Sequence, residues 1–115
     1  MAKQNRRIWV AVNGYGVIGK RVADAIALQE DMVLVGVSDV AADWRVRIAE
    51  RKGYPLFAAT GEHAKTMKGA GLPVAGALAD LLGEIDVIVD CTPKGLGAKN
   101  AEVYRRAGVR FRAGW

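Results

Sequence analysis

The feature that most constrains this chain is a glycine-rich turn, residues 14–19, placed between an apolar run and an amphipathic pattern. The apolar run, Ile8–Val12, is continuous, as in a strand whose two faces are both covered. After the turn the periodicity becomes helical from Val17 to Gln29, with an expected apolar stripe of Ile18, Val22, Ala25 and Ile26. A strand that passes through a tight turn into a helix is the opening unit of an α/β fold.

The same alternation of strand and helix continues along the chain. Asp43 is suited to cap one of the later helices, and Gly53 to end it. Further strands are expected at 33–37, 56–59, 87–89 and 109–112, and further helices at 44–52, 63–70, 77–82 and 98–107. No two apolar runs are joined by a hairpin turn, so the strands should be parallel and connected by right-handed crossovers. The prediction is a doubly wound parallel α/β sheet of five strands, in one domain over residues 1–115.

Composition narrows the class of protein. With 51% hydrophobic and 25% charged residues, the chain has the balance of a globular domain and not of a disordered one. The net charge of +5 suits a phosphate-bearing ligand or a nucleic acid, although the charges are scattered. A single cysteine excludes an internal disulfide and a cysteine-built zinc site, and it fits a cytoplasmic protein. The sequence has no apolar stretch of membrane-helix length and no signal-peptide pattern.

The turn itself, Gly14-Tyr15-Gly16-Val17-Ile18-Gly19, fits the G-x-G-x-x-G pattern in its strand-to-helix context. Gly14 permits the tight turn, Gly16 lets a pyrophosphate approach the backbone, and Gly19 lets the helix pack on the sheet. The N–H groups of Val17 and Ile18 would face the phosphates at the positive end of the helix dipole. The motif predicts a Rossmann site for a dinucleotide that uses all six residues. The alternative is a turn that only packs the helix.

Asp39 is the expected cofactor-selecting residue. It lies twenty residues after Gly19, at the end of the second expected strand. A carboxylate there accepts hydrogen bonds from the adenosine ribose, which favours NAD, and it repels the 2′-phosphate of NADP. Arg45 and Arg47 follow and could offset that repulsion. The alternative for Asp39 is a solvated turn residue.

A second wall of the site is expected after the strand at 87–89. In a doubly wound sheet this strand neighbours the first, and ligands bind outside the carboxyl ends of the two. Thr92 can hydrogen-bond a ligand there, and Pro93 stiffens the turn. Lys94 could reach a phosphate or remain solvated.

No reaction centre is evident in the sequence. Cys91 and His63, the only residues of their types, fall in different parts of the predicted topology. Cys91 is interpreted as a small apolar strand-end residue and His63 as a surface residue. No Ser–His–Asp set, paired carboxylates or metal-ligand cluster is present either. The sequence therefore predicts a cofactor site with no catalytic residues and no metal.

Several segments carry a family resemblance. They are the run Ala11–Ala25, the pair Asp31-Met32, Lys52-Gly53-Tyr54, the run Gly71–Gly76, and Val89–Pro93 with Gly97–Asn100. Together they resemble the N-terminal part of archaeal-type phosphorylating glyceraldehyde-3-phosphate dehydrogenase, in order and over nearly the whole chain. The resemblance implies that Val17 and Ile18 contact NAD or NADP, that full-length chains form a cytoplasmic tetramer, and that the enzyme serves glycolysis or gluconeogenesis as an oxidoreductase.

The chain also departs from that family. The family's active-site cysteine lies in a Ser-Cys-Asn-Thr motif beyond this length, and its histidine lies further still, so Cys91 is not the equivalent. Where relatives often carry Thr-Lys after the second strand, suited to NADP, this chain has Ser38-Asp39-Val40, which favours NAD. The expected function is thus the cofactor-binding part of the dehydrogenase, inactive by itself, with the catalytic domain absent from this chain.

Three other interpretations stay open at this level. One is a standalone NAD(H)-binding regulatory module without catalysis. Another is a fragment of a different Rossmann reductase, such as a semialdehyde dehydrogenase. The weakest is a nucleic-acid binder, based on a basic C-terminal cluster that is usually just solvated: Arg105, Arg106, Arg110 and Arg112. We therefore expect neither nucleic acid nor membrane as a partner.

Overall fold

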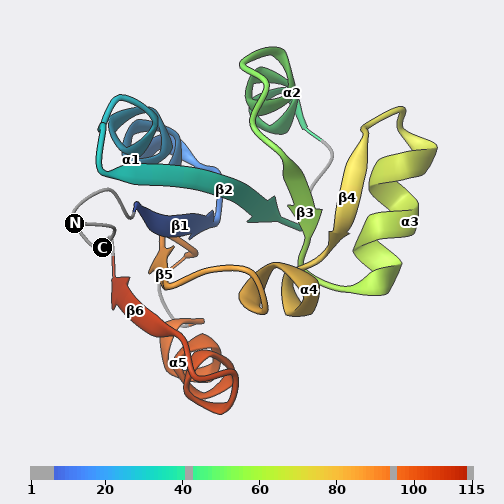
Figure 1. The fold of residues 1–115 in the computed structure, drawn as a ribbon. Coiled ribbons are helices and arrows are strands. Elements are labelled where there is room, and N and C mark those ends of the chain that lie inside the picture. The colour runs from blue at the N-terminus through green and yellow to red at the C-terminus, as the bar shows by residue number, and fades with distance from the viewer. Residues whose placement is uncertain (1–6, 41–42, 94–95, 114–115) are drawn as a thin grey trace.

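The computed structural model describes residues 7–40, 43–93 and 96–113. It contains a single six-stranded sheet with helices on both faces (Figure 1). The strands are β1 (Ile8–Asn13), β2 (Met32–Asp39), β3 (Leu56–Ala58), β4 (Val74–Ala77), β5 (Val87–Asp90) and β6 (Arg110–Ala113). The helices are α1 (Val17–Ala27), α2 (Trp44–Arg51), α3 (Gly61–Gly69), α4 (Leu78–Leu82) and α5 (Gly97–Arg106).

The strand order is β4-β3-β2-β1-β5-β6, and every pairing is parallel. The order reverses at β1, which pairs with β2 on one side and with β5 on the other. This confirms the doubly wound fold and puts the switch point at the carboxyl end of β1. The turns that follow β1 and β5 therefore face each other across one crevice.

The expected number of strands was wrong by one, because Val74–Ala77 forms the edge strand β4. Leu56 of β3 is in register with Val74, and Ala58 with Ala77. The segment reads VAGA and follows Pro73, so it carries almost none of the β-branched or aromatic residues that mark a strand. An edge strand needs only one neighbour, and pairing with β3 supplies it.

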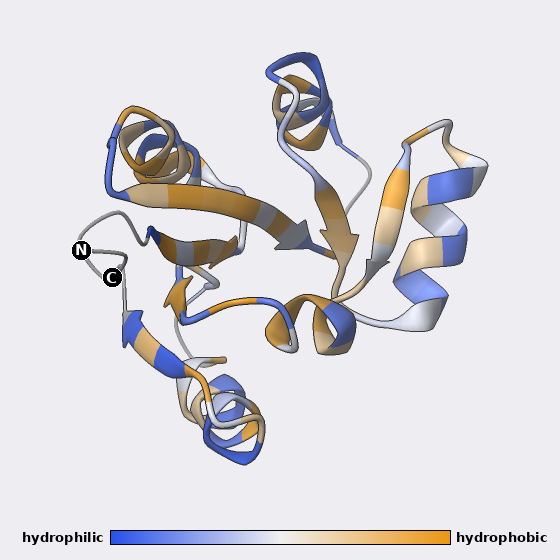
Figure 2. Ribbon diagram, viewed as in Figure 1, coloured by the Kyte–Doolittle hydropathy of each residue, from blue (hydrophilic) through white to orange (hydrophobic). Residues whose placement is uncertain are grey.

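Two apolar clusters hold the layers together. On one face of the sheet, residues of α1, α2 and α3 form one cluster with Val10 and Val12 of β1. On the other face, residues of α4 and α5 form a second cluster with Ala11 and Ile88. Figure 2 shows the result, with hydrophobic strands inside and hydrophilic outer faces on the helices. Among the described residues, no helix has both the length and the apolar character needed to cross a bilayer.

The predicted apolar stripe of α1 is confirmed for Ile26, which is buried, and for Val22, which packs against the core, but it is wrong for Ile18 and Ala25. Gly19, Ala23 and Ile26 are the buried residues, whereas Ile18 is 50% exposed. Gly19 has no side chain to signal its position in a hydrophobicity pattern, yet it is buried against Gly14 and Cys91 in the turns after β1 and β5. The buried face of α1 is therefore centred one residue later than the apolar spacing indicates.

Candidate functional site

A pocket of about 550 Å³ lies at the switch point, between the carboxyl ends of β1, β2 and β5. Its lining residues come from three turns that are far apart in the sequence: Asn13, Gly14, Gly16, Val17, Ile18, Asp39, Val40, Asp43, Arg45, Cys91, Thr92, Pro93 and Leu96. Seven predicted site residues are among them, namely Gly14, Gly16, Val17, Ile18, Asp39, Thr92 and Pro93. A larger hollow of about 840 Å³ lies at the opposite, amino end of β1 and β5, away from these turns.

The glycine-rich turn is packed backbone against backbone. Gly14 has φ +93°, and a Cβ on it would lie 2.8 Å from the backbone of Cys91 and Thr92. A Cβ on Gly19 would clash with the carbonyl oxygen of Gly14. These two glycines are therefore required by sterics, as predicted, and they bring the turns after β1 and β5 into contact.

Gly16 differs from these two glycines. An added Cβ there would meet only an Arg45 nitrogen, 3.6 Å away, among the described residues. Its φ of −86° is open to any residue, so neither backbone strain nor packing demands a glycine. The space above Gly16 is part of the pocket, which leaves the backbone of the turn open to a ligand.

The N-terminus of α1 opens into the same pocket. Gly16 caps it without a side-chain hydrogen bond, and the first turn holds no acidic residue. In contrast, Asp43 caps α2, as predicted, and Thr60 caps α3. The positive end of the α1 dipole, with its unsatisfied N–H groups, is therefore presented to the pocket, where it favours an anionic group such as a phosphate.

Tyr15 contributes to the site through its backbone. Its side chain is 1% exposed and packs in the core beneath α1 and α2, where burial raises the pKa of the phenol to about 12. Its N–H donates to Asp39 Oδ2 at 2.7 Å. Of the six residues of the motif, Tyr15 and Gly19 do not line the pocket. They support the structure of the turn instead.

Asp39 joins the end of β2 to this turn. Besides accepting from Tyr15, its carboxylate accepts from the N–H of Val40 at 2.6 Å. The residue is half-buried and lines the pocket. A carboxylate has about four acceptor positions, so holding the turn is compatible with accepting from a ligand hydroxyl. Asp39 is thus part of the structure of the turn as well as of the pocket surface.

The two arginines that follow β2, Arg45 and Arg47, have different surroundings. Arg45 lines the pocket, with its Nε 3.7 Å from Asp43 Oδ2 and its guanidinium 5.8 Å from the centre of the Trp44 ring. The Nε atom has no hydrogen-bond partner among the described residues. Arg47 instead donates to the carbonyl oxygen of Ala70 at 2.7 Å. Only Arg45 of this pair is therefore in place to contact a ligand of the pocket.

The second wall depends on a buried carboxylate that sequence reasoning missed. Asp90, at the end of β5, is 3% exposed. Its Oδ1 accepts from the backbone N–H and the hydroxyl of Thr92, and its Oδ2 accepts from Asn100 and Tyr104 of α5. Burial by itself would raise the pKa of Asp90, but these hydrogen bonds outweigh it and hold the pKa below the usual value. The carboxylate is therefore ionised.

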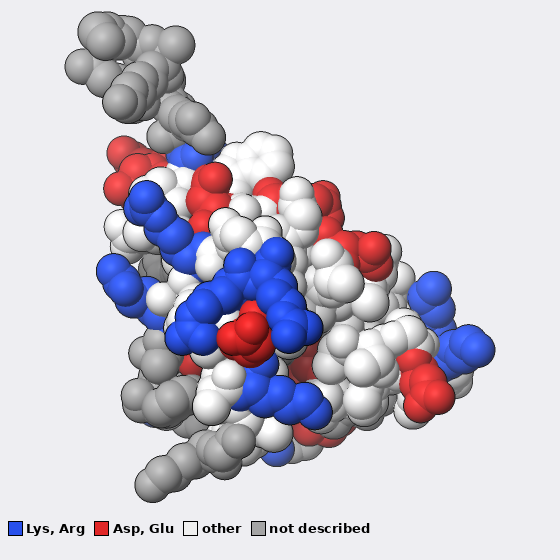
Figure 3. Space-filling model, turned by 90° about the horizontal axis from the view of Figure 1, so that it is seen from below, with Lys and Arg blue, Asp and Glu red and all other residues white. Residues whose placement is uncertain are grey.

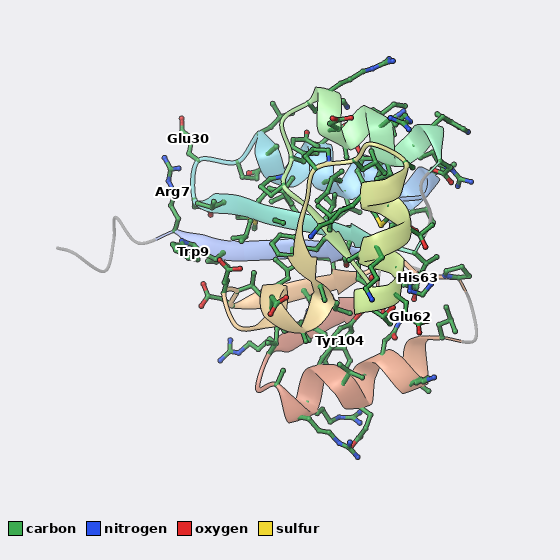
Figure 4. All side chains as sticks on the ribbon, turned by 90° about the vertical axis from the view of Figure 1, so that its right-hand side faces the viewer. Arg7, Trp9, Glu30, Glu62, His63 and Tyr104 are labelled. Atoms are coloured by element: carbon green, nitrogen blue, oxygen red, sulfur yellow. The ribbon has the colours of Figure 1, made fainter. Side chains whose placement is uncertain are left out.

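The polar contacts continue under the pocket to β2. Tyr104, which points from α5 toward the sheet, donates to Asp90 Oδ2 at 2.8 Å and accepts from Asn13 Nδ2 at 2.8 Å (Figure 4). Ser38 donates to Asn13 Oδ1 at 2.8 Å. Polar residues at the ends of three apolar strands were the one available signal for Asn13, Ser38 and Asp90. Tyr104 gave no signal, because its helix places it only once the fold is known.

Cys91 and His63 lie apart, as expected. Cys91 follows β5 and lines the pocket, where burial raises the pKa of its thiol and leaves it protonated at neutral pH. His63 is near the start of α3, with Nδ1 2.8 Å from the Thr60 hydroxyl (Figure 4). No cluster of His, Cys, Asp and Glu suited to a metal occurs in the described ranges. Lys94 lies outside the described residues.

A parallel doubly wound sheet with a glycine-rich turn and an open helix N-terminus at its switch point is a nicotinamide-dinucleotide-binding domain of the Rossmann class. Residues 8–114 match the family described as dihydrodipicolinate reductase, N-terminus, and the chain belongs to that family. A solved structure of GenD2 from gentamicin A biosynthesis, in complex with NAD, has the same fold. The two share 21% identity and a TM-score of 0.70 over 94% of this chain and 26% of that one.

Among curated proteins, the chain is similar to the N-terminal portion of archaeal glyceraldehyde-3-phosphate dehydrogenases. It is 50% identical over 101 residues to the enzyme of Methanothermus fervidus, covering 88% of this chain and 30% of that protein. It is 52% identical over 103 residues to that of Methanothermobacter thermautotrophicus, covering 90% and 31%. The chain thus spans about a third of the length of the curated relatives it matches.

Proposed function

We propose that residues 1–115 form the cofactor-binding domain of an NAD(P)-dependent phosphorylating glyceraldehyde-3-phosphate dehydrogenase, acting in glycolysis or gluconeogenesis. The observation that carries the proposal is the uncapped N-terminus of α1 above Gly16, enclosed by Asp39 on one side and Thr92 on the other. Identity of about half over nine-tenths of the chain to archaeal enzymes of that name supports the substrate class.

Each site residue has a proposed role. The N–H groups of Val17 and Ile18 bind the pyrophosphate, and Gly16 lets it approach the backbone, while Gly14 and Gly19 let the turn and helix pack closely. Asp39 accepts from the adenosine ribose hydroxyls, and Tyr15 holds Asp39 in place through its N–H. Thr92 and Pro93 bound the other half of the cofactor. When bound, the dinucleotide supplies the hydride acceptor, and this chain's residues hold and orient it.

We propose further that NAD is preferred over NADP. The negative charge of Asp39 lies in the pocket, where it would repel a 2′-phosphate. Arg45 lines the same pocket and reduces that repulsion without removing it, because part of its charge is already satisfied by Asp43 at 3.7 Å. The difference in Kd between the two cofactors should therefore be moderate.

The family model supports a second candidate function. Its description names dihydrodipicolinate reductase, so the second candidate is the cofactor-binding part of another dinucleotide-dependent reductase. The two candidates share the cofactor site and differ only in the substrate handled outside this chain. The identity of about 50% to the glyceraldehyde-3-phosphate dehydrogenases favours the first.

The test is calorimetric titration of the purified chain with NAD and NADP, comparing wild type with Gly16→Val. One-site binding with no dehydrogenase turnover is expected for wild type. Gly16→Val should abolish binding without unfolding the chain, since its side chain enters the pocket and not the core. The matched control is Gly61→Val, because a Cβ at Gly61 meets no described atom within 4 Å and lies outside the pocket. Equal binding by the two variants would refute the site.

A further inference from the structure

The turns on the two sides of the pocket are held by different means. The glycine-rich turn is anchored to β2, since the N–H of Gly14 donates to the Ser38 carbonyl at 2.7 Å and that of Tyr15 to Asp39. The turn after β5 keeps one bond to β1, from the Cys91 N–H to the Asn13 carbonyl at 2.8 Å. The next residue, Thr92, bonds instead to the side chains of Asp90 and Asn100.

A chain of hydrogen bonds links the Asp90 carboxylate to β1 and β2. Ser38 donates to Asn13, Asn13 to Tyr104, and Tyr104 to Asp90, each at 2.8 Å. The direction is fixed because the Tyr104 hydroxyl has one proton, which goes to the carboxylate, while its oxygen accepts from the amide. Tyr104 is 0% exposed and does not line the pocket. Its hydroxyl joins β1 to β5 directly beneath the second wall.

The two turns also correspond to the two halves of a dinucleotide. With the pyrophosphate at the N-terminus of α1 and the adenosine ribose at Asp39, the adenosine half lies on the β2 side of the switch point. The remaining half must extend to the other side, toward β5 and Thr92. A change in the position of Thr92 should therefore affect one half of the ligand and leave the other in place.

We infer that Tyr104 is a positioning residue. It helps to hold Asp90, and Asp90 in turn holds Thr92 where Thr92 can contact the nicotinamide-ribose half of the cofactor. This inference rests on the proposed function. Without the Tyr104 hydroxyl, Asp90 loses one of its four hydrogen bonds and the Asn13 amide loses its acceptor, so the carboxylate is held less firmly. Thr92, which donates to Asp90 through both its N–H and its hydroxyl, is then positioned less precisely.

The experiment compares Tyr104→Phe with Tyr54→Phe by titration with NAD and with ADP, which has no nicotinamide ribose. Tyr54 is the matched control, because its hydroxyl also donates to a carboxylate, Asp24 Oδ1 at 2.7 Å, but outside the pocket. Tyr104→Phe should raise the Kd for NAD about tenfold, the effect of one lost charge-assisted hydrogen bond, and leave the Kd for ADP unchanged. Tyr54→Phe should change neither.

A purely structural role would give a different pattern. If Tyr104→Phe only loosened the fold, the Kd values for NAD and ADP would rise together, and the inference would be overturned. It would also be overturned if neither Kd changed. Should Tyr104→Phe fail to fold, Asn100→Ala takes its place, because Asn100 donates to Asp90 at 3.0 Å and to Thr92 at 3.1 Å. Wild type that binds ADP and NAD equally overturns this inference alone, whereas wild type that binds neither overturns the proposed function as well.

Discussion

Asp39 carries two roles on one carboxylate. It holds the glycine-rich turn through the Tyr15 N–H at 2.7 Å, and it puts a negative charge on the wall of the pocket that Arg45 also lines. The first role would be needed for any dinucleotide, and the second bears on the 2′-phosphate alone. Substitutions at Asp39 should therefore affect both cofactors, though unequally.

Asp39→Ala should weaken the binding of NAD by about tenfold and the binding of NADP by less. Both cofactors lose the turn contact and the ribose acceptor, each a hydrogen bond to a charged group, but NADP also loses a repulsive charge. Titration of wild type and variant with each cofactor gives the ratio of the variant Kd to the wild-type Kd, once for NAD and once for NADP. Asp39→Asn is the comparison variant, because it removes the charge and keeps an acceptor for the Tyr15 N–H. An equal loss for NAD and NADP in Asp39→Ala would contradict the assigned selectivity.

At the scale of the element, the joint between β5 and α5 depends on an ionised group. The pKa of Asp90 is lower in the folded chain than its ordinary value of about 4, because hydrogen bonds from Thr92, Tyr104 and Asn100 outweigh burial. A group with a lowered folded pKa stabilises the protein above the unfolded value. That contribution is lost as the pH falls through the folded value.

Asp90→Asn should therefore destabilise the domain at neutral pH more than in acid. A loss of about 2 kcal/mol at pH 7, typical of removing a hydrogen-bonded charge, corresponds to a fall in Tm of about 8 °C. At pH 3 the difference from wild type should narrow, since wild-type Asp90 begins to protonate. Thermal melts at the two pH values measure this, with the exposed Asp31→Asn as control. A difference that stays constant with pH would show that the charge of Asp90 contributes nothing.

An element could be predicted from sequence when the residues that define it lie close together along the chain. The strands β1, β2 and β5 are continuous apolar runs, and Gly14 and Gly19 belong to a motif with fixed spacing, so local pattern sufficed. The edge strand β4 is defined by its pairing with β3 and has little pattern of its own. The hydrogen bond from Asn13 to Tyr104 spans 91 residues, and no local pattern encodes it.

At the scale of the whole molecule, the net charge of +5 is not concentrated at the pocket. Lys and Arg side chains gather on the face formed by α5 (Figure 3), where Arg105 and Arg106 lie 3.3 and 3.4 Å from Glu102. Among the described pocket-lining residues, Arg45 is the only cation. The overall charge can still attract an anionic dinucleotide at long range, and salt should weaken that contribution.

Binding at the switch point should stabilise the whole fold, because the pocket joins turns that follow β1, β2 and β5. A ligand that binds only the folded chain adds about 2.7 kcal/mol at a concentration one hundred times its Kd. For a domain of 115 residues, this corresponds to a rise in Tm of about 10 °C. Thermal melts with increasing NAD measure the shift, and Gly16→Val, which blocks the pocket without touching the core, should show none. If the same rise occurs in Gly16→Val, NAD binds elsewhere, because a chain whose pocket is filled by a valine side chain cannot gain stability from a ligand of that pocket.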